Sequence, residues 1–348
     1  MTDFPDIPLG AEDRELADGV RAGARRAVAK AITLVESVKP EHQKRAAALL
    51  DHLLPDTGKA MRLGITGVPG VGKSTFIEAL GLDLIARGHR VAVLAIDPSS
   101  SVTGGSILGD KTRMEQLSMR EEAFIRPSPS AGSLGGVAEK TREAMLICEA
   151  AGFDVIIVET VGVGQSETTV AGMTDCFVLL QLPNAGDELQ AIKKGVVELA
   201  DIVVFNKADL DPVAAERAAG QMRSALAMLR PASDHWQPPV LSVSAARRTP
   251  TGIPSGNAMA DFWATVERHR QALTESGELA AKRRHQARAW MWQLIDAGLR
   301  SRFRRQPAVA AELPKLTEAV AAGTTTPAAA AKRLLELPGH AYDNLKFD

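Results

Sequence analysis

A phosphate-binding pattern of the form G-x-x-x-x-G-K-S starts at residue 67. It consists of Gly67, Val68, Pro69, Gly70, Val71, Gly72, Lys73, Ser74 and Thr75. In such a loop the backbone N–H groups surround phosphate oxygens at the start of a helix, where an anion is stabilised. We expect Lys73 to contact the β- and γ-phosphates during catalysis and the Ser74 hydroxyl to bind Mg²⁺. The loop therefore predicts that the chain binds a nucleoside triphosphate.

The choice of base is predicted by a second pattern, N-K-x-D, at Asn206, Lys207 and Asp209. The Asp209 carboxylate can accept hydrogen bonds from the N1–H and N2–H groups of guanine together, whereas adenine offers no such pair of donors. Further along the chain, Ser244 and Ala245 resemble the S-A loop that contacts guanine through its backbone. The expected nucleotides are therefore GTP and, after hydrolysis, GDP.

These motifs must be positioned by the segments around them. Between residues 61 and 250, short apolar runs alternate with segments of helical length. The runs are Arg62–Thr66, Val91–Ile96, Ala123–Arg126, Asp154–Glu159, Cys176–Leu182, Asp201–Asn206 and Val240–Val243. This alternation predicts an α/β fold with a doubly wound, mostly parallel sheet. Because ligands bind beyond the carboxyl ends of parallel strands, the residues that end the runs, including Asp97 and Glu159, are candidate site residues.

Helical regions are expected on either side of this sheet domain. The expected parts are a disordered tail over residues 1–11, a helical extension over 12–58, a P-loop GTPase domain over 59–255 and a helical region over 256–348. In the extension, apolar spacing predicts one helix from Glu12 to Val38 and a second over residues 41–54. After residue 255 it predicts long helices with a break at Ser276–Gly277.

The C-terminal helices carry an unusual mixture of aromatic, aliphatic and basic residues. Arginines alternate with large apolar side chains, which are Trp290, Trp292, Leu294, Ile295, Leu299 and Phe303. An amphipathic arm of this composition is typical of a subunit interface. A helix that packs on its own core and exposes a basic face explains the pattern equally well.

Composition limits the classes of function. The chain of 348 residues has a formal net charge of −1, which gives no electrostatic reason to expect binding to nucleic acid or to a membrane surface. No apolar run approaches the length that spans a bilayer, and the acidic start lacks the features of a signal or transit segment. Cys148 and Cys176 lie in apolar segments and are expected to be buried, reduced thiols. We therefore expect a cytoplasmic protein.

A third pattern, Glu159-x-x-Gly162, lies where P-loop GTPases have the Walker B strand and the D-x-x-G motif of switch II. Longer strings accompany it, at Ala95–Ser101, Leu108–Met114 and Leu182–Gln190. In combination these strings resemble the MeaB/ArgK/MMAA family of GTPase chaperones. Members of that family serve adenosylcobalamin-dependent acyl-CoA mutases, chiefly methylmalonyl-CoA mutase. The resemblance covers nearly the whole chain.

The resemblance implies a P-loop domain of the SIMIBI class and a C-terminal helical arm that forms a homodimer. It also implies that three acidic residues surround the phosphates and Mg²⁺ in addition to Ser74, namely Asp97, Asp110 and Glu159. Of these, Asp97 and Glu159 would join Lys73 in catalysis. Glu159 would bind the metal or orient the attacking water, and the sequence leaves both roles open.

The activity implied by the resemblance is hydrolysis of GTP by a chaperone. This chaperone would gate the loading of adenosylcobalamin and protect or reactivate the mutase, with an adenosyltransferase as a further partner. One alternative is a GTPase that inserts metal ions into nickel enzymes, but the histidines are scattered and neither cysteine has a C-x-C or C-x-x-C partner. The other alternative is a kinase acting on a transport protein, as the older name of the ArgK branch suggests.

Overall fold

The computed structural model describes residues 9–97, 114–129, 134–160, 166–183, 194–229, 233–245 and 258–337. Residues 1–8, which belong to the expected tail, lie outside these ranges. The chain divides into a larger unit, Met1–Gln286, and a smaller unit, Ala287–Asp348. In the part of the chain that is described, every helix is too short or too polar to cross a membrane.

The larger unit is built on one sheet of seven parallel strands in the order β3-β2-β4-β1-β5-β6-β7. Every strand expected from the apolar runs is present. The strands are β1 (Met61–Gly67), β2 (Val91–Asp97), β3 (Ala123–Pro129), β4 (Val155–Thr160), β5 (Cys176–Gln181), β6 (Ile202–Phe205) and β7 (Val240–Ser242). The predicted doubly wound fold is confirmed, and the sheet is wholly parallel.

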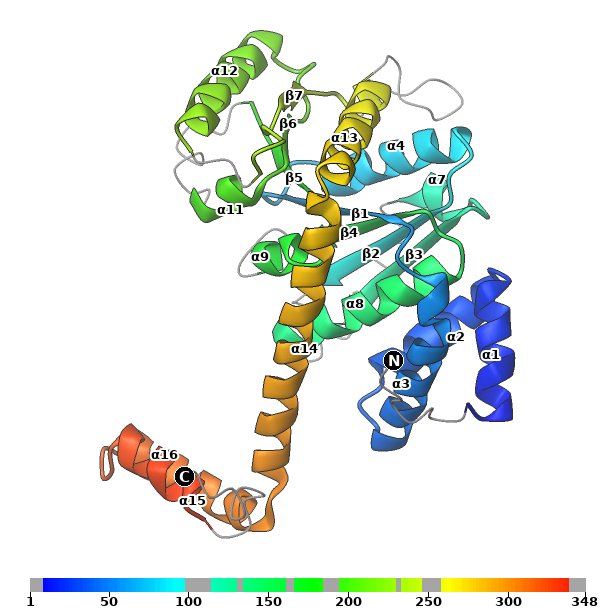
Figure 1. Cartoon of the computed structure of the whole chain (residues 1–348). Helices are drawn as coiled ribbons and strands as arrows, with labels where there is room; N and C mark the ends of the chain where they lie inside the picture. Colours follow the sequence, from blue (N-terminus) through cyan, green and yellow to red (C-terminus); the bar gives the residue numbers. More distant parts are fainter. Residues whose placement is uncertain are drawn as a thin grey trace. The chain divides into compact units, whose positions relative to one another are not determined.

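Helices cover both faces of the sheet because side chains of the buried strands alternate between two cores. On one face, Leu63 and Ile65 of β1 pack in the same core as Phe76 and Phe262. This face carries α4 (Lys73–Ala86), the short α7 (Glu115–Ser118) and α13 (Ala258–Glu275). The other face carries α8 (Leu134–Ala150) and α9 (Ser166–Ala171), and towards β6 it carries α11 (Lys194–Leu199) and α12 (Pro212–Met228). Figure 1 shows α4 and α8 on opposite sides of the strands.

The N-terminal extension consists of α1 (Ala11–Arg21), α2 (Arg25–Glu36) and α3 (Pro40–Leu53), followed by the single turn η1 (Leu54–Asp56). The expected continuous helix from residue 12 to 38 is therefore wrong. Gly23 interrupts it with a left-handed φ of +69°, and a Cβ there would lie 2.9 Å from the Arg90 guanidinium. Glycine relieves both problems, so the chain turns at this point. Apolar residues of α2 and α3 share a core with α8 (Figure 1).

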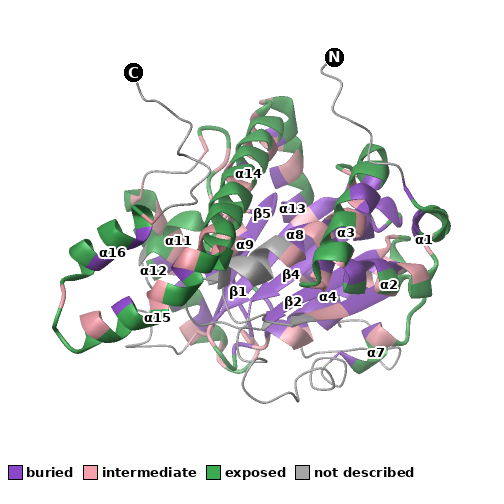
Figure 2. Ribbon diagram, turned by 90° about the horizontal axis from the view of Figure 1, so that it is seen from below, coloured by how far each residue is buried: buried purple, intermediate pink, exposed green. Residues whose placement is uncertain are grey.

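The C-terminal helices begin in the larger unit. Gly277, with φ +77°, separates α13 from α14 (Glu278–Arg305), as the sequence predicts. The smaller unit contains the rest of α14 with α15 (Pro307–Ala321) and α16 (Pro327–Leu335). It has a small core of its own, formed by Val309, Leu316, Ala330 and Leu334. In Figure 2 the central strands are buried, whereas α14 is largely exposed.

Both cysteines are free and buried, as predicted. Burial raises the pKa of the Cys148 and Cys176 thiols above the ordinary range. A thiol that stays protonated is a poor nucleophile and a poor metal ligand, so the two cysteines act as small apolar core residues.

Candidate nucleotide site

The phosphate-binding loop joins the end of β1 to the start of α4, which begins at Lys73. Gly72 caps the helix with a left-handed φ of +93°. A Cβ at this position would lie 2.8 Å from the Asn206 amide nitrogen. Glycine is therefore needed here twice, for the turn itself and for the close approach of the N-K-x-D segment.

Lys73 is buried although it carries a charge. Its ammonium donates to the carbonyl oxygen of Gly67 at 2.8 Å and to that of Val68 at 3.3 Å. These bonds hold the lysine across the loop that the sequence predicts to surround phosphates. A cation held in this place can stabilise negative charge on a transferring phosphoryl group.

Ser74 and Glu159 meet at the carboxyl edge of the sheet. The Ser74 hydroxyl donates to Glu159 Oε1 at 3.3 Å, and the Glu159 side chain is buried. The contact forms because β4 pairs with β1, which places Glu159 opposite Ile65. A hydroxyl and a carboxylate are hard oxygen donors of the type that Mg²⁺ prefers, so this pair fits the expected metal.

The other two acidic candidates are placed less completely. Asp97 ends β2, and its neighbour Ile96 lies opposite Thr160 of β4, so the Asp97 backbone lies at the same edge as Glu159. The Asp97 side chain and the whole of Asp110 lie outside the described residues. Their predicted contacts with Mg²⁺ stay predictions.

The N-K-x-D segment follows β6 and is bonded directly to the phosphate-binding loop. Asn206 is buried, donates to the Val71 carbonyl at 2.9 Å and accepts from the Ala245 N–H at 3.4 Å. Lys207 has a left-handed φ of +59° and donates to the Gly70 carbonyl at 2.9 Å. Asn206 therefore joins three segments, which are far apart in the sequence, into one site.

Asp209 is oriented by the S-A loop. Its backbone N–H donates to the Ser244 hydroxyl at 3.0 Å, and the N–H of Ala208 donates to the Val243 carbonyl at 3.0 Å. Both bonds follow from the parallel pairing of β6 with β7, which brings the ends of these strands together. The predicted phosphate, metal and guanine residues that the structure describes thus lie along one edge of the sheet.

One part of this edge was missed by sequence reasoning. The hydroxyls of Thr66 and Thr160 lie 2.7 Å apart and are buried. They join the ends of β1 and β4 on the sheet face opposite Glu159, because successive strand residues point to opposite faces. The signal was present, since Thr66 ends one apolar run and Thr160 directly follows another, but their pairing depends on strand order.

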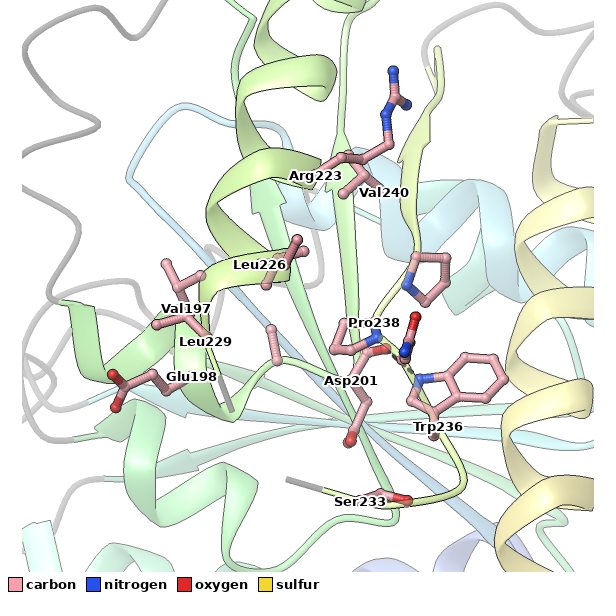
Figure 3. A pocket seen from close by; sticks show the side chains of 14 residues that line it. Val197, Glu198, Asp201, Arg223, Leu226, Leu229, Ser233, Trp236, Pro238 and Val240 are labelled. Atoms are coloured by element: carbon pink, nitrogen blue, oxygen red, sulfur yellow. Dashed lines mark hydrogen bonds between the residues drawn. The ribbon is translucent and has the colours of Figure 1, made fainter. Parts of the chain in front are cut away.

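A cavity lies at the opposite end of the strands from these residues. It has a volume of about 580 Å³ and is lined by residues of α11, α12, β7 and the segment before β7, including Leu226, Trp236 and Val240. Figure 3 shows the Trp236 ring beside Asp201, where its indole N–H donates to the Asp201 carbonyl at 2.8 Å. Because this cavity lies at the amino-terminal ends of β6 and β7, it is separate from the nucleotide site.

A buried polar cluster adjoins this cavity, formed by Cys176, Asp201 and His269. The Asp201 carboxylate accepts from the Phe177 N–H at 2.8 Å and lies 3.3 Å from the Lys282 ammonium. Burial alone would raise the pKa of Asp201, but the nearby His269 ring, whose Nε2 lies 3.5 Å from Oδ1, and the charge of Lys282 lower it below the ordinary value. Asp201 is therefore an ionised, paired aspartate. Through it the cluster attaches α13 and α14 to the sheet.

Comparison with known proteins agrees with this geometry. A family model described as methylmalonyl Co-A mutase-associated GTPase MeaB matches residues 28–308. A protein of Caulobacter vibrioides that carries the name GTPase is 58% identical over 314 residues, covering 90% of this chain and 94% of that protein.

Two further relatives carry more specific names. GTPase ArgK of Escherichia coli is 52% identical, over 78% of this chain and 80% of that protein. The methylmalonic aciduria type A homolog, mitochondrial, of Mus musculus is 44% identical, over 95% and 82% respectively. Among solved structures, LAO/AO transport system kinase superposes with a TM-score of 0.72 at 39% identity, covering 95% of this chain and 98% of that one.

Proposed function

The chain is a GTP-hydrolysing enzyme of the MeaB family of methylmalonyl-CoA mutase-associated GTPases, and we propose that it is a chaperone for a cobalamin-dependent mutase. In this proposal GTP hydrolysis gates the loading of adenosylcobalamin and protects or reactivates the mutase. The client is methylmalonyl-CoA mutase or a related acyl-CoA mutase, with an adenosyltransferase as a further partner. The protein acts in the cytoplasm.

The proposed chemistry is in-line attack of water on the γ-phosphate of GTP. The contact that carries it is the one between the Ser74 hydroxyl and Glu159 Oε1, at 3.3 Å. Ser74 and Glu159 would hold Mg²⁺ together with Asp97 and Asp110, and the bound ion would neutralise charge on the β- and γ-phosphates. Lys73 and the loop amides stabilise the transferring phosphoryl group, while Glu159 orients the attacking water.

Guanine specificity follows from Asp209 and its neighbours. We propose that the Asp209 carboxylate accepts from guanine N1–H and N2–H, and that Asn206 and Lys207 support the loop and cover the base. The bonds of Asn206 to Val71 and of Lys207 to Gly70 support this, since they connect the base site to the phosphate site. The S-A loop at Ser244 and Ala245 completes the pocket with backbone groups.

The chaperone role predicts that cofactor loading depends on the nucleotide. We expect the purified protein to bind apo-methylmalonyl-CoA mutase and to change the rate of holoenzyme formation with GTP but not with a non-hydrolysable analogue, because only hydrolysis would release the gate. Mutase activity and cobalamin absorbance would be followed together. Loading that is identical with and without the protein, for all acyl-CoA mutases tested, would contradict the proposal.

An experiment with labelled GTP distinguishes a GTPase from the kinase alternative. With GTP labelled at the γ-phosphate, a GTPase releases the label as inorganic phosphate. A kinase would transfer the label to a hydroxyl of its protein partner. Label retained on the partner would therefore favour the kinase.

We further propose that α14 forms a homodimer interface. Its residues Met291, Leu294, Ile295 and Leu299 are exposed and recur at helical spacing, as in an apolar stripe that needs a partner. Exposed fractions of 50% for Met291 and 45% for Leu299 leave this stripe uncovered within the described part of the chain. A second copy offers the same stripe, which makes a two-fold contact possible.

If α14 forms the dimer interface, a single charge introduced into the apolar stripe should convert the dimer to monomers. Leu294→Glu should shift the sedimenting species from dimer to monomer, because a carboxylate would be buried without a partner. Gln293→Glu is the matched control, since this exposed neighbour lies on the other side of the helix. Dimers that persist in Leu294→Glu would place the interface elsewhere.

A further inference from the structure

The short helix α9 follows Glu159 and leads into β5. It has six residues, Ser166–Ala171, which is too short to be stable without help from its surroundings. The last carbonyl groups of any helix also lack partners within the helix. Besides the packing of Val170 in the core, donors that other elements supply therefore help to set the position of α9.

Those donors come from α8 and α14. Arg142 of α8 donates to the Gly172 carbonyl at 3.0 Å. Gln286 of α14 donates to the Thr174 carbonyl at 2.9 Å and, at the longer distance of 3.5 Å, to the Ala171 carbonyl. Gln286 is buried, whereas the residues of the same helix from 291 to 300 are exposed.

The start of α14 also holds Asp175, the next residue of the connection between α9 and β5. Arg283 contacts both oxygens of Asp175, at 2.8 and 2.7 Å, and donates to the Ala60 carbonyl at 2.7 Å. Lys282 donates to the Asp175 carbonyl at 2.7 Å. Lys282, Arg283 and Gln286 thus lie within about one helical turn and together fix the α9–β5 connection, residues 171–175.

We infer that the first turns of α14, chiefly through Gln286, position α9 and, through it, the Glu159 carboxylate of β4 for GTP hydrolysis. Hydrolysis needs the attacking water and the phosphoryl group aligned closely, and a misplacement of about 1 Å costs up to about 100-fold in rate. The six-residue helix α9 packs on β4, the strand that carries Glu159, so a shift of α9 would also move the Glu159 carboxylate. Gln286 acts through α9 and is a positioning residue.

Nucleotide binding should be much less sensitive to the same contact. The phosphate loop is held by β1 and α4, and the guanine segment by β6 and β7. Loss of the Gln286 donors should therefore lower the turnover of GTP without weakening nucleotide affinity. The inference requires only GTP hydrolysis, so it stands or fails independently of the chaperone role. Helix α14 would then have two functions, because its first turns hold α9 and its later residues form the proposed dimer stripe.

The test compares Gln286→Met with Gln293→Met in the full-length protein. Methionine keeps the length of glutamine but removes its N–H donors, and residue 293 lies two turns further along the same side of α14. We expect Gln286→Met to lower kcat for GTP by about tenfold while the Kd values for GTP and GDP stay within about twofold, because two carbonyl groups lose their donor. Gln293→Met should match the wild type.

Hydrogen exchange gives a second readout. Amides of residues 166–175 should exchange faster in Gln286→Met, and those of the phosphate loop should not. A kcat equal to that of the wild type would overturn the inference. So would a parallel loss of kcat, nucleotide affinity and Tm, which would indicate a general structural role. Gln286→Leu also removes the donors without burying a charge, so it serves if Gln286→Met does not fold.

Discussion

Lys73→Ala is expected to lower GTP hydrolysis by about 10³-fold, because it removes the cation that stabilises charge on the transferring phosphoryl group. The Lys73 ammonium already lies on the Gly67 and Val68 carbonyls, at 2.8 and 3.3 Å, inside the loop that is predicted to bind phosphate. Phosphate release at saturating GTP and equilibrium binding of fluorescent GDP would measure the two effects separately. We expect the loss to fall mainly on turnover, since the loop amides and the guanine segment would still bind GDP.

Lys44→Ala is the matched control for this variant. Lys44 lies exposed on α3, in the N-terminal extension, so its removal takes away the same charge without touching the nucleotide site. Its turnover should equal that of the wild type. GTP turnover that survives unchanged in Lys73→Ala would show that the phosphate loop has been assigned to the wrong residues.

Asp209→Asn is expected to reverse the choice of base. The asparagine side chain can offer only one acceptor to guanine and places an N–H₂ group against the N1–H or N2–H donor, so GTP affinity should fall by about 100-fold or more. Xanthine carries an oxygen where guanine carries its amino group, so xanthosine triphosphate should bind this variant better than GTP does. Competition binding with both triphosphates would measure the switch.

Asp211→Asn provides a control two residues away. The Asp211 side chain accepts from the Ala214 N–H at 2.9 Å and caps α12. Asparagine caps a helix about as well as aspartate, so this variant should keep both its stability and its preference for GTP. If Asp209→Asn binds GTP as tightly as the wild type, Asp209 does not contact the base.

Much of the fold could be predicted because its signals are local. Each of the seven strands reads as a short apolar run, and the break between α13 and α14 falls at Gly277, which takes a left-handed φ. The prediction of one long N-terminal helix was wrong because the feature that ends this helix is not local. Apolar spacing continues smoothly across Gly23, and the close approach of Arg90 that makes a turn necessary comes from another part of the chain.

The site could be predicted in its parts but not in its connections. The motifs at Lys73, Glu159 and Asn206 are visible as residue types at fixed spacing, since each carries its own chemistry. The bonds between them were not visible, because Ser74 meets Glu159 only when β1 pairs with β4. Gln286 gave no signal at all, since a glutamine in a polar helix reads as an exposed residue.

By itself the sequence determined a parallel α/β fold, a phosphate loop and a guanine motif, because helix and strand periods and these motifs depend on neighbouring residues. Only the tertiary structure decided which strands lie side by side and which distant groups bond. It placed Asn206 against Val71 and Gln286 against Thr174, contacts that span 135 and 112 residues. Such contacts follow from strand order and from burial of apolar faces, which are properties of the whole chain.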